Sequence, residues 1–166
     1  MESRRELINF EIKRNPGIRF RELMKIIGVK NGIMSYYIRK LEATGDIRIE
    51  RTPRVSRFYS CDLSEEESKL VKRLRQETPK RILVSLVENN TLTFQELVQN
   101  IRKAPSTTSF YLKQLVSDNI IATSRSDFKT VYSVSEKKRI ANLIEEYYPD
   151  IIEQASDNLS DIIESL

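Results

Sequence analysis

The chain has 166 residues, of which 39% are hydrophobic and 31% charged, so its length suits one domain or two small ones. It contains no histidine and only one cysteine, which excludes a zinc site of Cys and His and removes the commonest general base. No apolar run approaches the ~18 residues of a membrane span, and the charged start MESRRE does not resemble a signal peptide. We therefore expect a cytoplasmic protein that is not an enzyme, holds no cofactor or metal and makes no membrane contact.

The charge is distributed unevenly along the chain. Residues 1–60 carry 14 Lys and Arg against 7 Asp and Glu, a net charge of +7. Residues 61–134 carry 11 against 9, and residues 135–166 carry 3 against 8. A basic beginning and an acidic end indicate a polyanionic partner for the first part and not for the last. Charged surfaces that are merely solvated would give the same pattern, so charge alone leaves both interpretations open.

The first part of the chain is predicted to form three helices and a β-hairpin. A leading helix ends at NPG, residues 15–17, and a short second helix, FRELMKII, starts at Phe20 and stops at Gly28. The expected core residues of these two helices are Ile8, Phe10, Ile12, Phe20, Leu23, Met24 and Ile27.

A third helix follows after a few-residue turn, with Asn31 as its expected N-cap and Gly45 as the left-handed residue that closes it. Its core positions, spaced i, i+4 and i+7, are Met34, Ile38 and Leu41. In the hairpin, Ile47 and Ile49 alternate with polar residues, and the tip has the sequence TPRVS.

The same pattern returns at an offset of 74 residues. FRELMKII at Phe20 aligns with FQELVQNI at Phe94, and SYYIRKL at Ser35 aligns without a gap with SFYLKQL at Ser109. Further pairs on this alignment are Ile8 with Ile82, Ile47 with Ile121, Arg51 with Arg125 and Phe58 with Tyr132. We therefore predict two copies of one structural unit. The predicted domains are residues 1–61, residues 62–134 and a C-terminal helical segment, 135–166.

The second copy has its own local signals. TFQE, residues 93–96, is a capping box for its second helix, and Pro105 suits the first turn of its third helix. The core positions of that third helix are Thr108, Leu112 and Leu115. Additional helices are predicted from Ser64 to about Glu77 and from Ser135 to near Pro149.

Three helices followed by a two-stranded wing form the winged helix-turn-helix arrangement. NGIMSYYIRKLEATGDI, from Asn31, and APSTTSFYLKQLVSDNII, from Ala104, resemble the third helix and first wing strand of ArsR/MarR-type winged-helix transcription regulators, especially archaeal ones. The resemblance implies a mainly α fold with small β-wings (α+β), in which two tandem winged helix-turn-helix domains precede C-terminal helices. It also implies sequence-specific binding of double-stranded DNA. The chain lacks the cysteine and histidine clusters of that family's metal sensors.

Members of this family commonly place the third helix in the DNA major groove and the wing on the flanking backbone. In the first unit, the helix face opposite the core stripe offers Arg39 and Lys40 for guanine or phosphate and Ile33 for a thymine methyl group. Tyr37 is expected to be a packing residue. The predicted DNA-binding residues of this unit are Lys30, Asn31, Gly32, Ile33, Ser35, Tyr36, Arg39, Lys40, Arg51, Arg54 and Arg57.

The corresponding helix of the second unit has Lys113 as the one charge on its outward face. The predicted DNA-binding residues of this unit are Ser106, Thr107, Ser109, Phe110, Lys113, Gln114, Arg125 and Lys129. A role in packing or dimerisation stays open for it. For the whole chain, a protein-interaction adaptor and an RNA-binding module are the alternative functions.

Residues 150–166 form a further amphipathic helical pattern. Its apolar positions are Ile151, Ile152, Ala155, Leu159, Ile162, Ile163 and Leu166. Pairing with the same helix of a second chain would bury this stripe in a homodimer. A helix folded back on its own domain would bury it as well, so both arrangements remain open.

Overall fold

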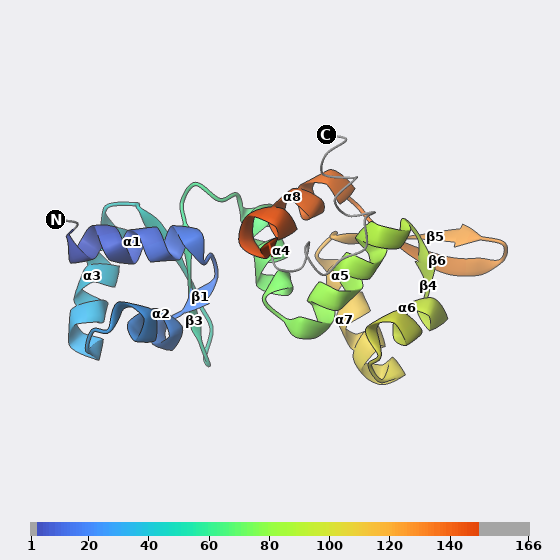
Figure 1. The fold of residues 1–166 in the computed structure, drawn as a ribbon, viewed down its shortest axis with the longest axis horizontal. Coiled ribbons are helices and arrows are strands. Elements are labelled where there is room, and N and C mark those ends of the chain that lie inside the picture. Colours follow the sequence, from blue (N-terminus) through green and yellow to red (C-terminus); the bar gives the residue numbers. More distant parts are fainter. Residues whose placement is uncertain (1–2, 150–166) are drawn as a thin grey trace. The chain divides into compact units, whose positions relative to one another are not determined.

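The computed structural model describes residues 3–149, which fall into two compact units divided between Lys72 and Arg73 (Figure 1). Within residues 3–149 no helix is long and apolar enough to cross a membrane. The predicted dimer seam at residues 150–166 lies outside the described residues and stays a prediction.

The first unit contains three helices and a small antiparallel sheet. In chain order its elements are α1 (Arg4–Arg14), β1 (Ile18–Arg19), α2 (Phe20–Ile27), α3 (Asn31–Ala43), β2 (Ile47–Arg51) and β3 (Ser56–Ser60). The strand order is β1-β3-β2, and Phe58 on the central strand lies between Ile18 and Ile49. Helix α4 (Glu65–Leu74) follows and crosses the division between the units.

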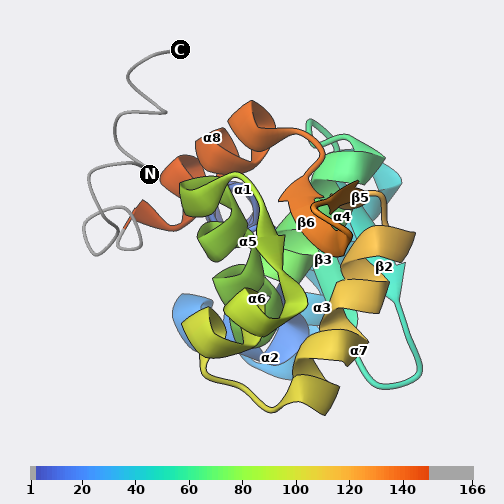
Figure 2. The ribbon, with the colours of Figure 1, turned by 90° about the vertical axis from the view of Figure 1, so that its right-hand side faces the viewer.

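The second unit has the same order of elements, followed by one more helix. They are α5 (Glu77–Asn89), β4 (Leu92–Thr93), α6 (Phe94–Ile101), α7 (Pro105–Ser117), β5 (Ile121–Ser126), β6 (Lys129–Val134) and α8 (Lys137–Tyr147). The strand order is β4-β6-β5, and α8 packs against α5 (Figure 2). The predicted mixed α+β class is therefore confirmed.

The core of the first unit collects one face of each helix and of the sheet. Its buried residues are Ile8, Ile12, Ile18, Leu23, Met34, Ile38, Leu41, Ile47 and Phe58. The predicted stripe of α3 is thereby confirmed. The prediction that Phe10 belongs to this core is wrong, because its side chain is 53% exposed. Two residues along a helix correspond to a rotation of about 200°, which turns Phe10 away from Ile8 and Ile12.

Local signals identified several helix ends correctly. Thr93 and Glu96 form the predicted capping box, in which each side chain accepts a hydrogen bond from the other residue's backbone N–H. Pro105 occupies the first turn of α7, and Gly45 has a φ of +74° just after α3. The N-cap of α3 is Lys30 and not Asn31. Asn31 begins the helix, and its Oδ1 accepts a hydrogen bond from Ser35 Oγ at 3.1 Å.

Other features were not predicted from the sequence. The two-residue strands β1 and β4 carry no pattern of their own and exist through pairing with β3 and β6. The helix predicted from Ser64 to about Glu77 ends at Leu74, and the chain restarts as α5 at Glu77.

Candidate nucleic-acid interface

The outward face of α3 carries most of the residues predicted to contact DNA. Burial of Met34, Ile38 and Leu41 leaves the other side of the helix in solvent. On that side Ile33 is 38% exposed and Tyr36 49% exposed. The other predicted contacts on and before this helix are the exposed Lys30, Asn31, Gly32, Arg39 and Lys40 and the half-buried Ser35.

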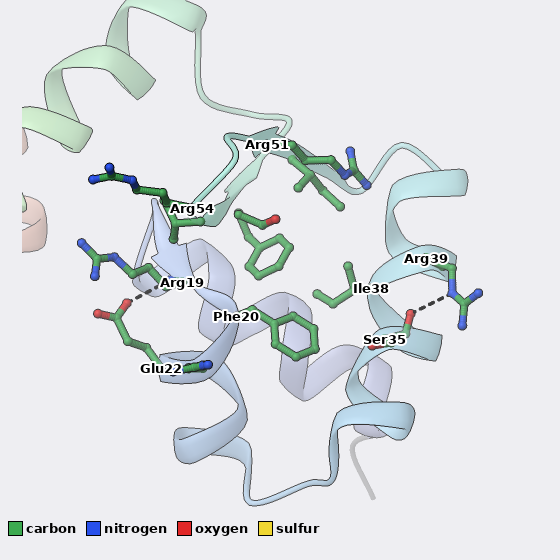
Figure 3. A pocket seen from close by; sticks show the side chains of 13 residues that line it. Arg19, Phe20, Glu22, Ser35, Ile38, Arg39, Arg51 and Arg54 are labelled. Carbon is green, nitrogen blue, oxygen red and sulfur yellow. Dashed lines mark hydrogen bonds between the residues drawn. The ribbon is translucent and has the colours of Figure 1, made fainter.

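Contacts along the helix order this face. Arg39 Nε donates to the Ser35 carbonyl at 3.2 Å, and its guanidinium points away from the helix (Figure 3). Lys40 Nζ lies 4.7 Å from the centre of the Tyr36 ring, a cation–π contact. Each of the two cations is therefore held against the preceding turn of the helix, and both are exposed. Tyr37 packs half-buried against the core, as predicted.

A hollow of about 1060 Å³ lies between α2, α3 and the β2–β3 hairpin of the first unit (Figure 3). Apolar side chains, among them Phe20 and Ile38, line part of it. Its cations are Arg19, Arg21, Arg39, Arg51 and Arg54. The one carboxylate in the lining is that of Glu22, which accepts a hydrogen bond from the Arg19 amide at 2.8 Å and so caps α2. The hollow is therefore strongly cationic.

Arg19 and Arg21 were missed in the sequence analysis. They flank Phe20, the first residue of α2, and both are exposed. The signal that could have revealed them is the pair of arginines at the start of a helix, where backbone N–H groups also attract anions.

The hairpin arginines differ in their surroundings. Arg51 donates from both terminal nitrogens to the carboxylate of Glu42, each at 2.8 Å. This hydrogen bonding holds the pKa of Glu42 below its usual value, so the carboxylate stays ionised and offsets the charge of Arg51. Arg54, at the hairpin tip, is exposed and lines the hollow.

The prediction that Arg57 belongs to the exposed DNA-binding surface is wrong. Its side chain is 6% exposed, and Nη1 donates to the Gly17 carbonyl at 2.9 Å. The reason is the short strand β1, which pairs with β3 and makes β3 the central strand of the sheet. Arg57 therefore ties the sheet to the loop after α1 and offers no charge to a ligand.

The outward face of α7 in the second unit is less basic. Ser106, Phe110 and Lys113 are exposed, with Phe110 at 56%, whereas Thr107 and Ser109 are half-buried. Ser109 and Lys113 line a smaller hollow of about 370 Å³, and Lys113 is its one cation among the described residues.

Gln114 was predicted to face outward, but it is held inside its own unit. Its Oε1 accepts a hydrogen bond from Arg73 Nη1 at 2.5 Å, and Arg73 Nε donates to Asp118 at 2.7 Å. Gln114 therefore helps to hold the end of α4 against α7 and is not a candidate for DNA contact.

The second hairpin is exposed from Ala122 to Thr130, the part around its tip. Arg125 and Lys129, the two predicted contacts, are exposed. Between them lies Phe128, whose side chain is 100% exposed and which the sequence analysis did not single out. The signal for it was a phenylalanine in a polar turn, SRSDFKT, where no apolar residue is needed.

Comparison with known proteins agrees with this description of the fold. Residues 75–122 match the model of the winged helix-turn-helix DNA-binding family. The matched stretch contains fewer than half of the residues of the chain. No curated protein sequence matches the chain.

Three solved structures illustrate the similarity. The transcriptional repressor PagR of Bacillus anthracis is 19% identical, with a TM-score of 0.43 over 48% of this chain and 90% of that one. The repressor BigR from Xylella fastidiosa is 23% identical, with a TM-score of 0.43 over 49% and 84%. Lactococcus lactis ZitR, solved in complex with DNA, is 15% identical, with a TM-score of 0.36 over 81% and 90%. At these values the similarity says nothing of what this chain binds.

The different surroundings of Arg57 and Arg54 lead to a stability prediction. Arg57→Ala should lower the free energy of unfolding by about 1.5–3 kcal/mol, because a buried hydrogen bond from a charged group is lost. Arg54→Ala should change it by less than about 0.5 kcal/mol, because the side chain lies in solvent. Urea denaturation of the full chain, followed by circular dichroism, measures both. Equal effects would contradict the structural role of Arg57.

Proposed function

We propose that this chain is a cytoplasmic transcription regulator that binds double-stranded DNA through two winged-helix units in tandem and catalyses no reaction. The observation that carries the proposal is the set of arginines around the hollow of the first unit, beside the basic face of α3. Four of them, Arg19, Arg21, Arg39 and Arg54, add to Arg51, whose charge Glu42 offsets. A concave basic surface next to an exposed helix suits the geometry of a duplex, where phosphates flank a groove that a helix can enter.

In the first unit, α3 enters the major groove. Arg39 and Lys40 contact guanine acceptors or phosphates, Ser35 bonds to either, and Ile33 contacts a thymine methyl group. The arginines at the start of α2 and at the hairpin tip hold phosphates beside the groove. These contacts position the helix, and the contacts to base edges supply the sequence preference.

The second unit supplies a smaller part of the binding energy. Its match to the winged helix-turn-helix DNA-binding family supports a contact with DNA. The exposed residues available for that contact are Ser106, Phe110, Lys113, Arg125 and Lys129. The half-buried Thr107 and Ser109 lie on the same helix. Because this surface has fewer cations, it should release fewer counterions than the first unit does.

The experiment that tests the proposal is a binding-site selection from random duplexes at moderate salt, followed by a salt titration on an enriched duplex. We expect a common sequence to be enriched and the logarithm of affinity to fall linearly with the logarithm of salt concentration. The absence of any enriched sequence would reject a sequence-specific regulator. Preference for RNA of the same sequence in competition would reject the DNA assignment.

The ranking of the two units gives a further prediction. Changing Arg39 and Lys40 together to Ala should weaken binding by about 1–3 kcal/mol for each lost base contact. Lys113→Ala should cost less, because it removes one cation from the less basic unit. Fluorescence anisotropy with the enriched duplex measures both. Arg14→Ala, which removes an exposed cation at the end of α1, is the control and should leave affinity unchanged. A larger loss from Lys113→Ala would reverse the ranking.

The ion pair between Arg51 and Glu42 gives a prediction of opposite sign. Glu42→Gln should tighten binding several-fold, because it removes a repelling carboxylate and releases Arg51 to bind a phosphate. One additional phosphate contact should steepen the log–log salt slope by about 0.9. Glu42 is ionised at neutral pH, and the hydrogen bonds from Arg51 lower its pKa further below the usual value, so the pair persists there until the substitution removes the charge.

Glu145→Gln is the matched control for this variant. It removes an exposed carboxylate from α8, far along the chain from the hairpin, and should change the salt slope little. If Glu42→Gln leaves both the affinity and the slope unchanged, Arg51 does not face DNA.

A further inference from the structure

Phe128 occupies the tip of the second hairpin and is fully exposed. The strand register pairs Arg125 with Thr130 and Ser126 with Lys129, so Asp127 and Phe128 form a two-residue loop. A hairpin tip needs no aromatic side chain for its own stability, and a fully exposed phenylalanine gains nothing from burial in this chain.

The backbone makes the choice of residue more unusual. Asp127 has a φ of +49° and Phe128 a φ of +63°. Two-residue loops with both central φ angles positive favour Asn-Gly or Asp-Gly, because glycine adopts this region without steric cost. A bulky side chain there is strained. Strain held at an exposed position points to a function of the side chain.

The surroundings of the ring favour a nucleic acid over a protein as its partner. Every residue from Ala122 to Thr130 is exposed, and Phe128 is the one large apolar side chain among them. Protein interfaces are built around a packed apolar centre of several residues, which a single ring on a polar ribbon does not supply. Arg125 and Lys129, one on each strand close to the loop, outnumber the single carboxylate of Asp127 and suit phosphates beside a groove.

We propose that Phe128 is a wedge that inserts between stacked base pairs from the minor groove and bends the DNA, an inference that rests on the proposed function. Apolar wedges of this kind unstack a base step and kink the duplex by about 20–90° toward the major groove. Pyrimidine–purine steps such as TA and CA are the easiest to unstack. The second hairpin therefore confers a preference for a deformable step without reading its base edges.

The two hairpins thus have different tips. In the first, Arg54 lies in a loop closed by hydrogen bonds between Thr52 and Val55, including the Val55 amide to Thr52 Oγ1 at 3.1 Å. A charged tip of this kind can hold a phosphate. In the second, an uncharged ring lies at the tip, so its removal should alter DNA bending without altering the number of phosphate contacts.

The test uses the full chain and a duplex of about 30 base pairs from the selection, with a donor dye and an acceptor dye at its ends. Energy transfer reports the bend, and anisotropy reports affinity. The wild-type chain should shorten the distance between the dyes. Phe128→Gly should abolish this change and weaken binding about tenfold, the order expected for one lost base–aromatic contact. Its salt slope should stay unchanged, because no charge is removed.

Two further variants serve as comparisons. Phe128→Leu keeps an apolar wedge and should keep most of the bend. Phe10→Ala removes a ring that is 53% exposed on α1 and should behave as wild type. Phe128→Gly relieves backbone strain at the loop, so its thermal midpoint should not fall, and weaker binding cannot be assigned to unfolding.

Several outcomes would overturn the wedge. If Phe128→Gly binds and bends the duplex as wild type does, the wedge is wrong while the proposed function stands. If Phe128→Gly instead changes the oligomeric state in light scattering and leaves the bend unchanged, the ring contacts a second copy of the chain. If the wild-type chain binds no duplex, both the wedge and the proposed function fail.

Discussion

Burial of the apolar stripe of α3 is the constraint on which the proposed DNA surface depends. Met34 and Leu41 are fully enclosed and Ile38 nearly so, which fixes the rotation of the helix about its axis. With that rotation fixed, Arg39 and Lys40 face solvent, and Arg39 lines the hollow together with residues of the β2–β3 hairpin. The outward chemistry is therefore a consequence of the inward packing.

The hydrogen-bond partners of the arginines determine how much of their positive charge remains available on that surface. Glu22 is occupied as the cap of α2, and Glu42 offsets Arg51 through two hydrogen bonds. Arg57 is removed from the surface altogether by its bond to the Gly17 carbonyl. A count of arginines along the hairpin thus overstates the positive charge presented there. What matters for a polyanion is the set whose charge is exposed and not compensated.

The two units use one order of elements for different surfaces. The first presents arginines around a hollow, whereas the second presents few cations and holds one of its outward residues, Gln114, in a bond to Arg73. Their hairpin tips differ in the same way, with an arginine in one and an exposed, strained phenylalanine in the other. A shared order of elements therefore does not imply a shared surface, because packing constrains the core positions and leaves the surface positions free.

By itself, the sequence determined the features that depend on neighbours a few residues apart. Helix periodicity identified the stripes of α3 and α7, and short-range chemistry identified the Thr93 capping box, Pro105 at the start of α7 and the left-handed Gly45. Only the tertiary structure decided the features that depend on distant partners. Pairing of β1 with β3 buried Arg57, and Arg73 engaged Gln114 from 41 residues away. Such contacts depend on how the elements pack, and they cannot be predicted from a local pattern of residue types.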